Sequence, residues 1–164
     1  MIFLNKTKPA FLVDAMLGNI AKKLRLLGFD TEYSSNILDE DLILRAKNEN
    51  RILITKDEML IQLSKKQNLI VIPITEEKEV NQLIQIFEGL GISKFMINGE
   101  NARCTICNGD LKPINKHDIQ NQIPTGILEK ITQFWICQRC NKVYWEGSHI
   151  DNLQKLVVDL NEKL

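Results

Sequence analysis

The sequence predicts an α/β fold with a parallel sheet, followed by a small C-terminal module that cysteine side chains hold together. Short apolar runs alternate with amphipathic helical patterns over the first hundred residues, as in successive βαβ units. The four cysteines follow as two Cys-x-x-Cys pairs. A length of 164 residues with 44% hydrophobic residues is enough for one domain and a small appended module. We therefore divide the chain into residues 1–100 and residues 101–164, the second part including a C-terminal helix.

The first two strands are predicted on either side of a helix. The apolar run 11–13 ends at Asp14 and indicates a buried strand. The next pattern places apolar residues on one face of a helix that ends at Gly28. Residues 29–33 then predict the second strand.

Two more helices and two more strands complete the predicted sheet. Asp39 stands where a helix N-cap is expected, and residues 51–55 form a strongly apolar strand that ends just before Asp57. A short helix over 59–65 leads to a fourth strand over 69–72. A further apolar helical face over 80–87 stops at a pair of glycines. These elements predict the strand order 2-1-3-4, with a ligand-binding switch point where strands 1 and 3 end.

Three aspartates are predicted to meet at that edge of the sheet. Asp14 follows strand 1, Asp39 opens the second helix and Asp57 follows strand 3. Each has a purely structural alternative as a helix N-cap. Together, carboxylates about 5 Å apart would repel by about 3 kcal/mol per pair at an effective dielectric of 20, and a hard divalent cation would remove that repulsion. We expect a catalytic Mg²⁺ or Mn²⁺ site here, with Glu40 and Glu58 as accessory acids.

The cysteine pairs, Cys104/Cys107 and Cys137/Cys140, predict a structural zinc site. A gap of 29 residues, from 108 to 136, separates the pairs, and four thiolates leave no open coordination position for a reacting water. A coincidence of spacing or a redox-active pair is the alternative. Metal binding would supply the stability that so small a module lacks.

Basic side chains near these two sites are the candidates for nucleic-acid contacts. The net charge is zero, yet residues 1–28 carry +4 and residues 29–100 carry −5. A neutral chain argues against bulk nucleic-acid binding, whereas local basic regions beside an acidic one fit a metal-dependent phosphodiester site. In sequence order the candidates are Lys22, Arg25, Arg139, Lys142 and His149. For the lysine and arginine of the first helix a solvated face is the alternative, and for His149 it is a structural hydrogen bond.

Several stretches together resemble the Mut-seven C-terminal RNase domain family. They are residues 11–18 (FLVDAMLG), 24–30 (LRLLGFD), 39–42 (DEDL), 51–57 (RILITKD), 103–108 (RCTICN) and 143–149 (VYWEGSH). The resemblance runs from about Phe11 to about Leu156. It implies a PIN-like three-layer α/β/α sandwich with a parallel sheet, followed by a four-cysteine zinc ribbon. It also implies a metal-dependent ribonuclease in which Asp14, Asp39 and Asp57 are the acidic metal ligands, with single-stranded RNA as the expected partner.

One departure from the family pattern keeps a second function open. Met59 stands where related domains carry a further acid. The alternative is a non-catalytic RNA- or ribosome-associated binding module with a degenerate PIN site. A phosphoryl-accepting receiver-like domain is disfavoured, because such a site wants paired acids at the end of strand 1 and only Asp14 is there.

Three further features of the sequence bear on where in the cell the protein is expected. No apolar run approaches the length of a membrane span, and charges interrupt the N-terminal segment. Paired cysteines in a chain without an export signal favour a reducing compartment. We therefore expect a cytoplasmic protein with no membrane partner.

Overall fold

A four-stranded parallel sheet forms the centre of the first domain. A computed structural model of the chain describes residues 8–92, 94 and 99–164, and for residues 148–150 it describes the backbone alone. The strands are β1 (Phe11–Val13), β2 (Thr31–Tyr33), β3 (Ile52–Thr55) and β4 (Val71–Pro73). Their order is β2-β1-β3-β4, with every neighbouring pair parallel, which confirms the predicted order 2-1-3-4.

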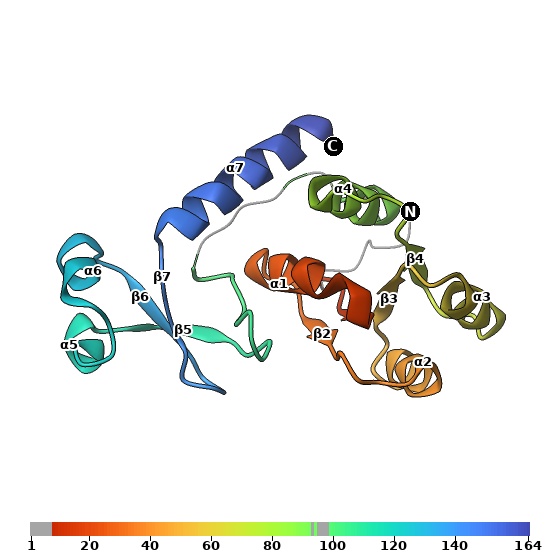
Figure 1. The fold of residues 1–164 in the computed structure, drawn as a ribbon, viewed down its shortest axis with the longest axis horizontal. Coiled ribbons are helices and arrows are strands. Elements are labelled where there is room, and N and C mark those ends of the chain that lie inside the picture. Colours follow the sequence, from red (N-terminus) through yellow and green to blue (C-terminus); the bar gives the residue numbers. More distant parts are fainter. Residues whose placement is uncertain (1–7, 93, 95–98) are drawn as a thin grey trace.

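Helices cover both faces of this sheet and give the predicted three layers (Figure 1). On one face lie α1 (Gly18–Leu26), which a short 3-10 helix, η1 (Ala15–Leu17), precedes, and α4 (Glu79–Leu90). On the other face lie α2 (Asp39–Asn48) and α3 (Glu58–Lys66). Side chains alternate between the two faces along each strand, so Phe11 and Val13 enter the first core while Leu12 enters the second.

The ribbon is a separate three-stranded antiparallel sheet in the order β5-β6-β7. Its elements are β5 (Leu111–Ile114), α5 (Lys116–Ile119), α6 (Thr125–Lys130), β6 (Phe134–Cys137) and β7 (Val143–Trp145). Ile119, Ile123 and Phe134 make a small core of their own. Phe134 and Trp135 are buried, so these two aromatics pack the module and are not available to stack on bases.

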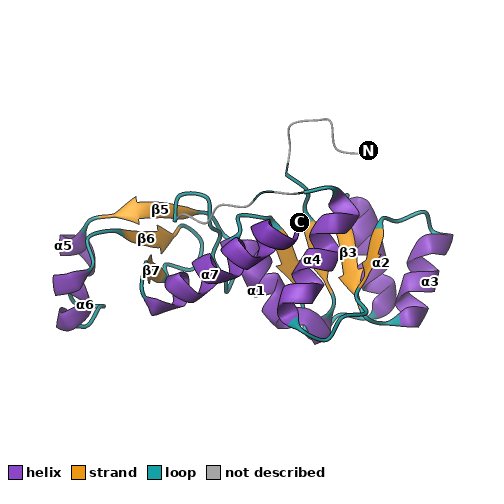
Figure 2. Ribbon diagram, turned by 90° about the horizontal axis from the view of Figure 1, so that it is seen from above, coloured by secondary structure: helices purple, strands orange, loops and turns teal. Residues whose placement is uncertain are grey.

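The C-terminal helix α7 (Ser148–Lys163) returns to the first domain. It runs beside α4, and its Val157 and Leu160 are buried in the same core as Leu83 and Phe87 (Figures 1 and 2). The sequence grouped this helix with the ribbon. The division near residue 100 stays a prediction, but in space the helix completes the apolar core of the sheet domain.

Some local expectations differ from the structure. Asp39 is the first residue of α2, and Leu38 occupies the N-cap position without a capping side chain. Strand β2 is shorter than the predicted 29–33, because its ladder with β1 starts where Phe11 pairs with Thr31. Within the described ranges, no helix is long and apolar enough to cross a membrane.

Candidate functional site

The four cysteines converge on one point between the two knuckles of the ribbon. Among the residues that the structure describes, they are the one group of three or more His, Cys, Asp or Glu side chains whose ligand atoms all lie within 4.8 Å of one another. The Sγ atoms of Cys104 and Cys140 are 3.6 Å apart, and those of Cys107 and Cys137 are 3.4 Å apart. A Zn–S bond of about 2.3 Å in a tetrahedron requires sulfurs about 3.8 Å apart. The donor set and its spacing therefore fit a structural Zn²⁺.

The backbone of each Cys-x-x-Cys pair folds into the same tight knuckle. The amide of Asn108 donates to the Cys104 carbonyl at 2.9 Å, and the amide of Asn141 donates to the Cys137 carbonyl at 3.0 Å. Both asparagines are left-handed, with φ of 63° and 60°, a conformation that asparagine tolerates better than most residues. A Cβ on the neighbouring Gly109 would lie 2.9 Å from the Cys137 Sγ, so glycine is required for this close approach.

Hydrogen bonds favour the thiolate form of Cys104. Burial raises the pKa of this thiol, but hydrogen bonds from the Tyr144 hydroxyl and from backbone amides outweigh burial and bring the pKa to about 6. The Tyr144 hydroxyl lies 3.1 Å from the Cys104 Sγ and also accepts the amide of Thr105 at 3.2 Å. Such partners around a ligand sulfur orient it toward the metal.

Asp14 and Asp57 meet at the carboxyl edge of the parallel sheet, with Thr55 between them. The Thr55 hydroxyl donates to Asp14 Oδ2 at 2.8 Å and accepts the backbone amide of Asp57 at 3.0 Å. The amide of Asp14 itself donates to the Ile54 carbonyl, so adjacent strands fix the register of the two acids. This edge is the predicted switch point. Thr55 was not predicted, although its place at the end of an apolar strand beside Asp57 could have marked it.

Both acids also act as helix caps. Asp14 Oδ1 accepts the amide of Ala15 at 2.6 Å, and Asp57 Oδ1 accepts the amide of Leu60 at 2.9 Å. The capping alternative is therefore correct for these two aspartates, but it uses only part of each carboxylate. The second oxygen of Asp57 accepts no hydrogen bond from the described residues, and this side chain is exposed.

The other predicted acids lie at the starts of the neighbouring helices. Asp39 and Glu40 are exposed in the first turn of α2, and Glu58 is exposed at the start of α3. Strands β2 and β3 both deliver the chain to this edge before those helices begin. In the described part of the chain, the three aspartates are not closed into a group as tight as the cysteines.

A pocket of about 320 Å³ opens beside the acidic edge. Met16 and Gly18 line it from η1 and α1, Lys56 lines it from the residue before Asp57, and Glu79 lines it from α4. The hydroxyl of Tyr33 donates to the Ala15 carbonyl at 3.0 Å and so ties the end of β2 to the turn that follows Asp14. The turn that follows Asp14 therefore both carries this acid and forms one wall of the pocket.

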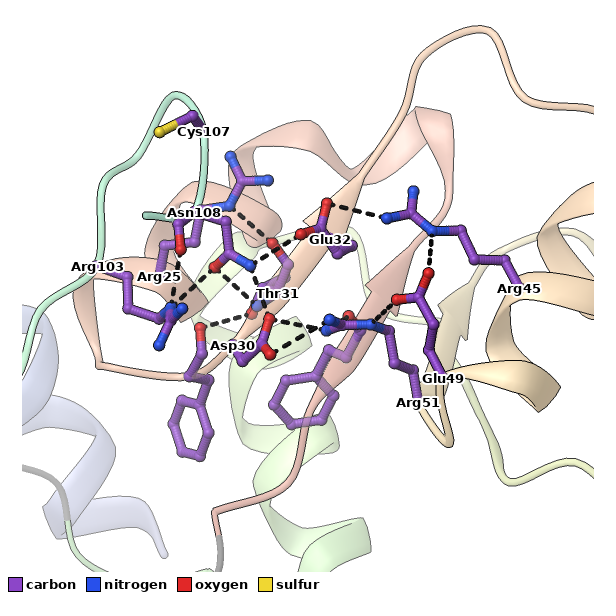
Figure 3. A network of polar contacts seen from close by, with 12 residues as sticks. Arg25, Asp30, Thr31, Glu32, Arg45, Glu49, Arg51, Arg103, Cys107 and Asn108 are labelled. Carbon is purple, nitrogen blue, oxygen red and sulfur yellow. Dashed lines mark hydrogen bonds and ion pairs between the residues drawn. The ribbon is translucent and has the colours of Figure 1, made fainter. Parts of the chain in front are cut away.

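Arg25 is a structural residue, which corrects its prediction as an RNA contact. Its side chain is only 5% exposed, and its guanidinium donates to the carbonyls of Thr31, Thr105 and Ile106 at 2.8, 2.8 and 3.2 Å. The helix pattern placed it opposite the apolar stripe, but the first zinc knuckle covers that side of α1. Figure 3 shows this knuckle docked against β2.

Asn108 makes the second part of this docking contact. Its side-chain oxygen accepts the amide of Thr31 at 3.0 Å, and its side-chain nitrogen donates to Asp30 at 2.7 Å and to Glu32 at 3.2 Å. Asp30 is also paired with Arg51 at 2.8 Å (Figure 3). Burial raises the pKa of Asp30, yet hydrogen bonds from Arg51 and Asn108 outweigh burial and hold that pKa below its usual value. We call these contacts between the first knuckle and β2 the docking face; its residues are Arg25, Asp30, Thr31, Glu32, Arg51 and Asn108. Hydrogen bonds and ion pairs connect them, and the positive and negative charges offset one another.

The remaining RNA candidates lie in different places. Lys22 is exposed on α1, and Lys142 is exposed with its ammonium 5.4 Å from the centre of the Tyr144 ring. Arg139 is exposed and donates to the Cys107 carbonyl at 2.8 Å, so its guanidinium partly serves the knuckle. The side chain of His149 lies outside the described residues.

Comparison with protein families decides the family of the chain. The model of the Mut7-C RNAse domain matches residues 9–157. The chain belongs to this family. The Mut7-C match covers the sheet domain, the ribbon and most of α7, so both parts of the structure belong to one family unit. Membership implies a ribonuclease that acts on RNA. Neither the comparison with curated proteins nor that with solved structures gave a match.

Proposed function

We propose that the chain is a metal-dependent ribonuclease that hydrolyses RNA phosphodiesters at the acidic edge of its parallel sheet. Asp14, Asp39 and Asp57 would hold Mg²⁺ or Mn²⁺, and a structural Zn²⁺ in the ribbon would keep the module that aids RNA binding folded. The observation that carries this proposal lies at the switch point of an RNase-family fold, where the Thr55 hydroxyl links the Asp14 carboxylate to the backbone amide of Asp57.

The residues at this edge fit a hard divalent cation. All the candidate ligands are carboxylate oxygens, which Mg²⁺ and Mn²⁺ prefer. Mg²⁺ usually keeps several waters and takes only one or two protein carboxylates together with substrate phosphates. A set of acids that is more open than the cysteine cluster therefore suits this ion, since waters and the RNA would complete the coordination shell.

The chain's own residues prepare the site before RNA arrives. A bound divalent cation would supply activation of water and stabilisation of negative charge on the phosphate. Thr55 holds Asp14 Oδ2, and the amide of Ala15 holds Asp14 Oδ1, so this carboxylate has one orientation. Because the Thr55 oxygen accepts the Asp57 amide, its proton is directed to Asp14. Thr55 is thus a positioning residue, and the charged carboxylates are the groups that act.

Cleavage of a mixed-sequence single-stranded RNA by zinc-loaded protein, in Mn²⁺ or in EDTA, tests the proposal. Asp14→Asn and Asp57→Asn keep a capping oxygen but remove the charge, so each should lower the rate at least about 100-fold without unfolding the helix. Asp39→Asn should also lower it. Asp41→Asn is the matched control, because Asp41 shares the first turn of α2 but lies about 160° from Asp39 around the helix axis.

One observation favours the alternative of a non-catalytic RNA-binding module. Met59 stands two residues after Asp57, and its side chain is 80% exposed at the site itself. If the protein binds RNA tightly but leaves it intact in Mn²⁺, or if the asparagine variants cut as well as the parent, the catalytic proposal fails. The binding-module function then becomes the better description.

A further inference from the structure

The three most exposed large hydrophobic side chains of the described chain all belong to the acidic edge. Met59 is 80% exposed, Met16 is 74% exposed and Leu38 is 73% exposed. Solitary exposed hydrophobic residues are common on protein surfaces and need no explanation. These three are not scattered, because each lies within two residues of one of the predicted acidic ligands.

The positions of these side chains are topologically equivalent. Met16 lies in η1 directly after β1, Leu38 is the N-cap of α2 after β2, and Met59 lies in the first turn of α3 after β3. The three strands are adjacent and parallel, so their carboxyl ends share one edge of the sheet. The acids and the apolar side chains therefore lie at the same edge of the sheet. We call Met16, Leu38 and Met59 the apolar rim.

The arginines of this domain are committed elsewhere. Arg25 is buried in the docking face, Arg51 pairs with Asp30, and Arg45 pairs with Glu32 and Glu49. Lys23 pairs with Glu79.

At the acidic edge, Lys56 is the basic residue that lines the pocket, and Met16 lines it as well. Phosphate contacts inside the pocket are therefore few. An RNA bound here needs another source of affinity.

We propose that the apolar rim contacts the bases of unpaired nucleotides and makes the site selective for single-stranded RNA. This inference rests on the proposed function and names the residues that would give it a preference for unpaired RNA. Bases in a single strand can splay out and present their faces to apolar side chains, whereas bases in a duplex are stacked inside the helix and present phosphates and sugars outward. The polarizable thioethers of Met16 and Met59 suit the flat faces of different bases without selecting a sequence.

Equilibrium binding of the zinc-loaded full chain in Ca²⁺ tests the rim separately from cleavage. The probes are a fluorescein-labelled single strand, the same strand annealed to its complement, and an abasic ribose-phosphate strand of equal length. The parent should bind the single strand most tightly. Met16→Gln, Leu38→Gln and Met59→Gln should each weaken single-strand binding about three- to tenfold and leave abasic and duplex binding unchanged. Ile70→Gln is the control. Ile70 is 51% exposed just before the amino end of β4, at the edge of the sheet opposite to the acids, so this substitution should have no effect on binding.

Three outcomes would overturn the rim proposal. They are unchanged single-strand binding in the triple variant, equal weakening for the abasic strand, and an equal effect of Ile70→Gln. Concentration-dependent dimerisation that the rim variants abolish, with RNA binding unaltered, would assign the rim to a second copy of the chain and also overturn it. Selective binding without cleavage in Mn²⁺ would support the rim while the proposed function fails, and cleavage with no rim effect would do the reverse.

Discussion

The sheet domain carries two acidic regions that differ in how their charges are used. At the docking face, Asp30 receives hydrogen bonds from both Arg51 and Asn108, and Glu32 faces Asn108 and Arg45. At the acidic edge, Asp57 is exposed and shares only one oxygen with a helix cap. Carboxylates paired with arginines contribute cohesion between parts of a fold, whereas Asp14 and Asp57 accept hydrogen bonds from neutral groups and keep a charge that an external cation can bind. The difference lies in the partners and not in the residue type.

Removal of zinc should have the largest effect and should break the docking face first. Metal binding contributes about 10–16 kcal/mol to small zinc modules, so the metal-free ribbon should lose its fold. Hydrogen exchange of the chelated protein should show lost protection in the ribbon strands and also at Thr31, whose amide donates to Asn108. The strands β3 and β4 should keep their protection. Full protection of the ribbon in a sample proven free of zinc would contradict this expectation.

Arg25→Met should be the most damaging single substitution at the docking face. It leaves three carbonyl groups without their donor, at a cost of about 1–3 kcal/mol for each buried one. We expect a loss of about 3 kcal/mol or more in the free energy of unfolding, measured in guanidinium chloride. Lys22→Met, on the exposed side of the same helix, is the control and should change little. The Arg25 effect should shrink in chelated protein, since two of the three carbonyls belong to the zinc knuckle.

Two substitutions of Asn108 distinguish the contribution of its left-handed backbone from that of its side-chain hydrogen bonds. Asn108→Gly keeps the left-handed turn but loses the four hydrogen bonds of the side chain, and we expect about 1–3 kcal/mol of destabilisation. Asn108→Ala should cost about 1 kcal/mol more because of strain at φ 63°. Asn141→Gly, in the second knuckle, should be nearly neutral because Asn141 is exposed. Equal losses for the two glycine variants would show that side-chain docking contributes nothing.

The docking face should also contribute to the loss of folding stability at low pH. Because Asp30 has a lowered pKa in the folded protein, its contribution is fully present above the unfolded value of about 3.9 and is lost as the pH falls through the folded value. Stability curves of the parent should therefore steepen below about pH 4. Asp30→Asn and Arg51→Met should both flatten that acid limb. An unchanged slope in both variants would remove Asp30 from the explanation.

The smallest effect on stability is expected at the acidic edge. Asp57→Asn should change the free energy of unfolding by less than about 0.5 kcal/mol, because asparagine caps a helix as well as aspartate does. Asp57→Ala should cost about 1 kcal/mol, since the acceptor for the Leu60 amide is lost. A large loss for the asparagine variant would mean that the charge itself stabilises the fold, and the contrast between the two regions would disappear.

Most of the architecture was predictable because it follows from periodicity and spacing. Alternation of buried strands with amphipathic helices fixed the strand order, and two Cys-x-x-Cys pairs located the cysteine cluster. The position of Asp14 and Asp57 at one edge follows from parallel topology alone. Their roles as metal ligands stay a prediction, as do those of Asp39, Glu40 and Glu58.

The errors arose where distant contacts or a neighbouring residue decided the outcome. Arg25 has a pattern typical of a solvated face, and it is buried because Thr105, 80 residues away in sequence, packs over it. Asp39 is a favourable capping type, but the chain begins α2 at Asp39 itself, with Leu38 as the cap residue. The return of α7 to α4 could not be read from its sequence, since an amphipathic helix does not say which apolar surface it covers.

That return has a mechanical consequence for the ribbon. A body joined to its neighbour at one point can swing in any direction, but a body joined at two points can turn only about the line between them. The ribbon is held at its first knuckle by Arg25 and Asn108 and at its far end by α7. Rotation about that line is the motion that would keep both attachments intact, and it would carry the ribbon along a single arc.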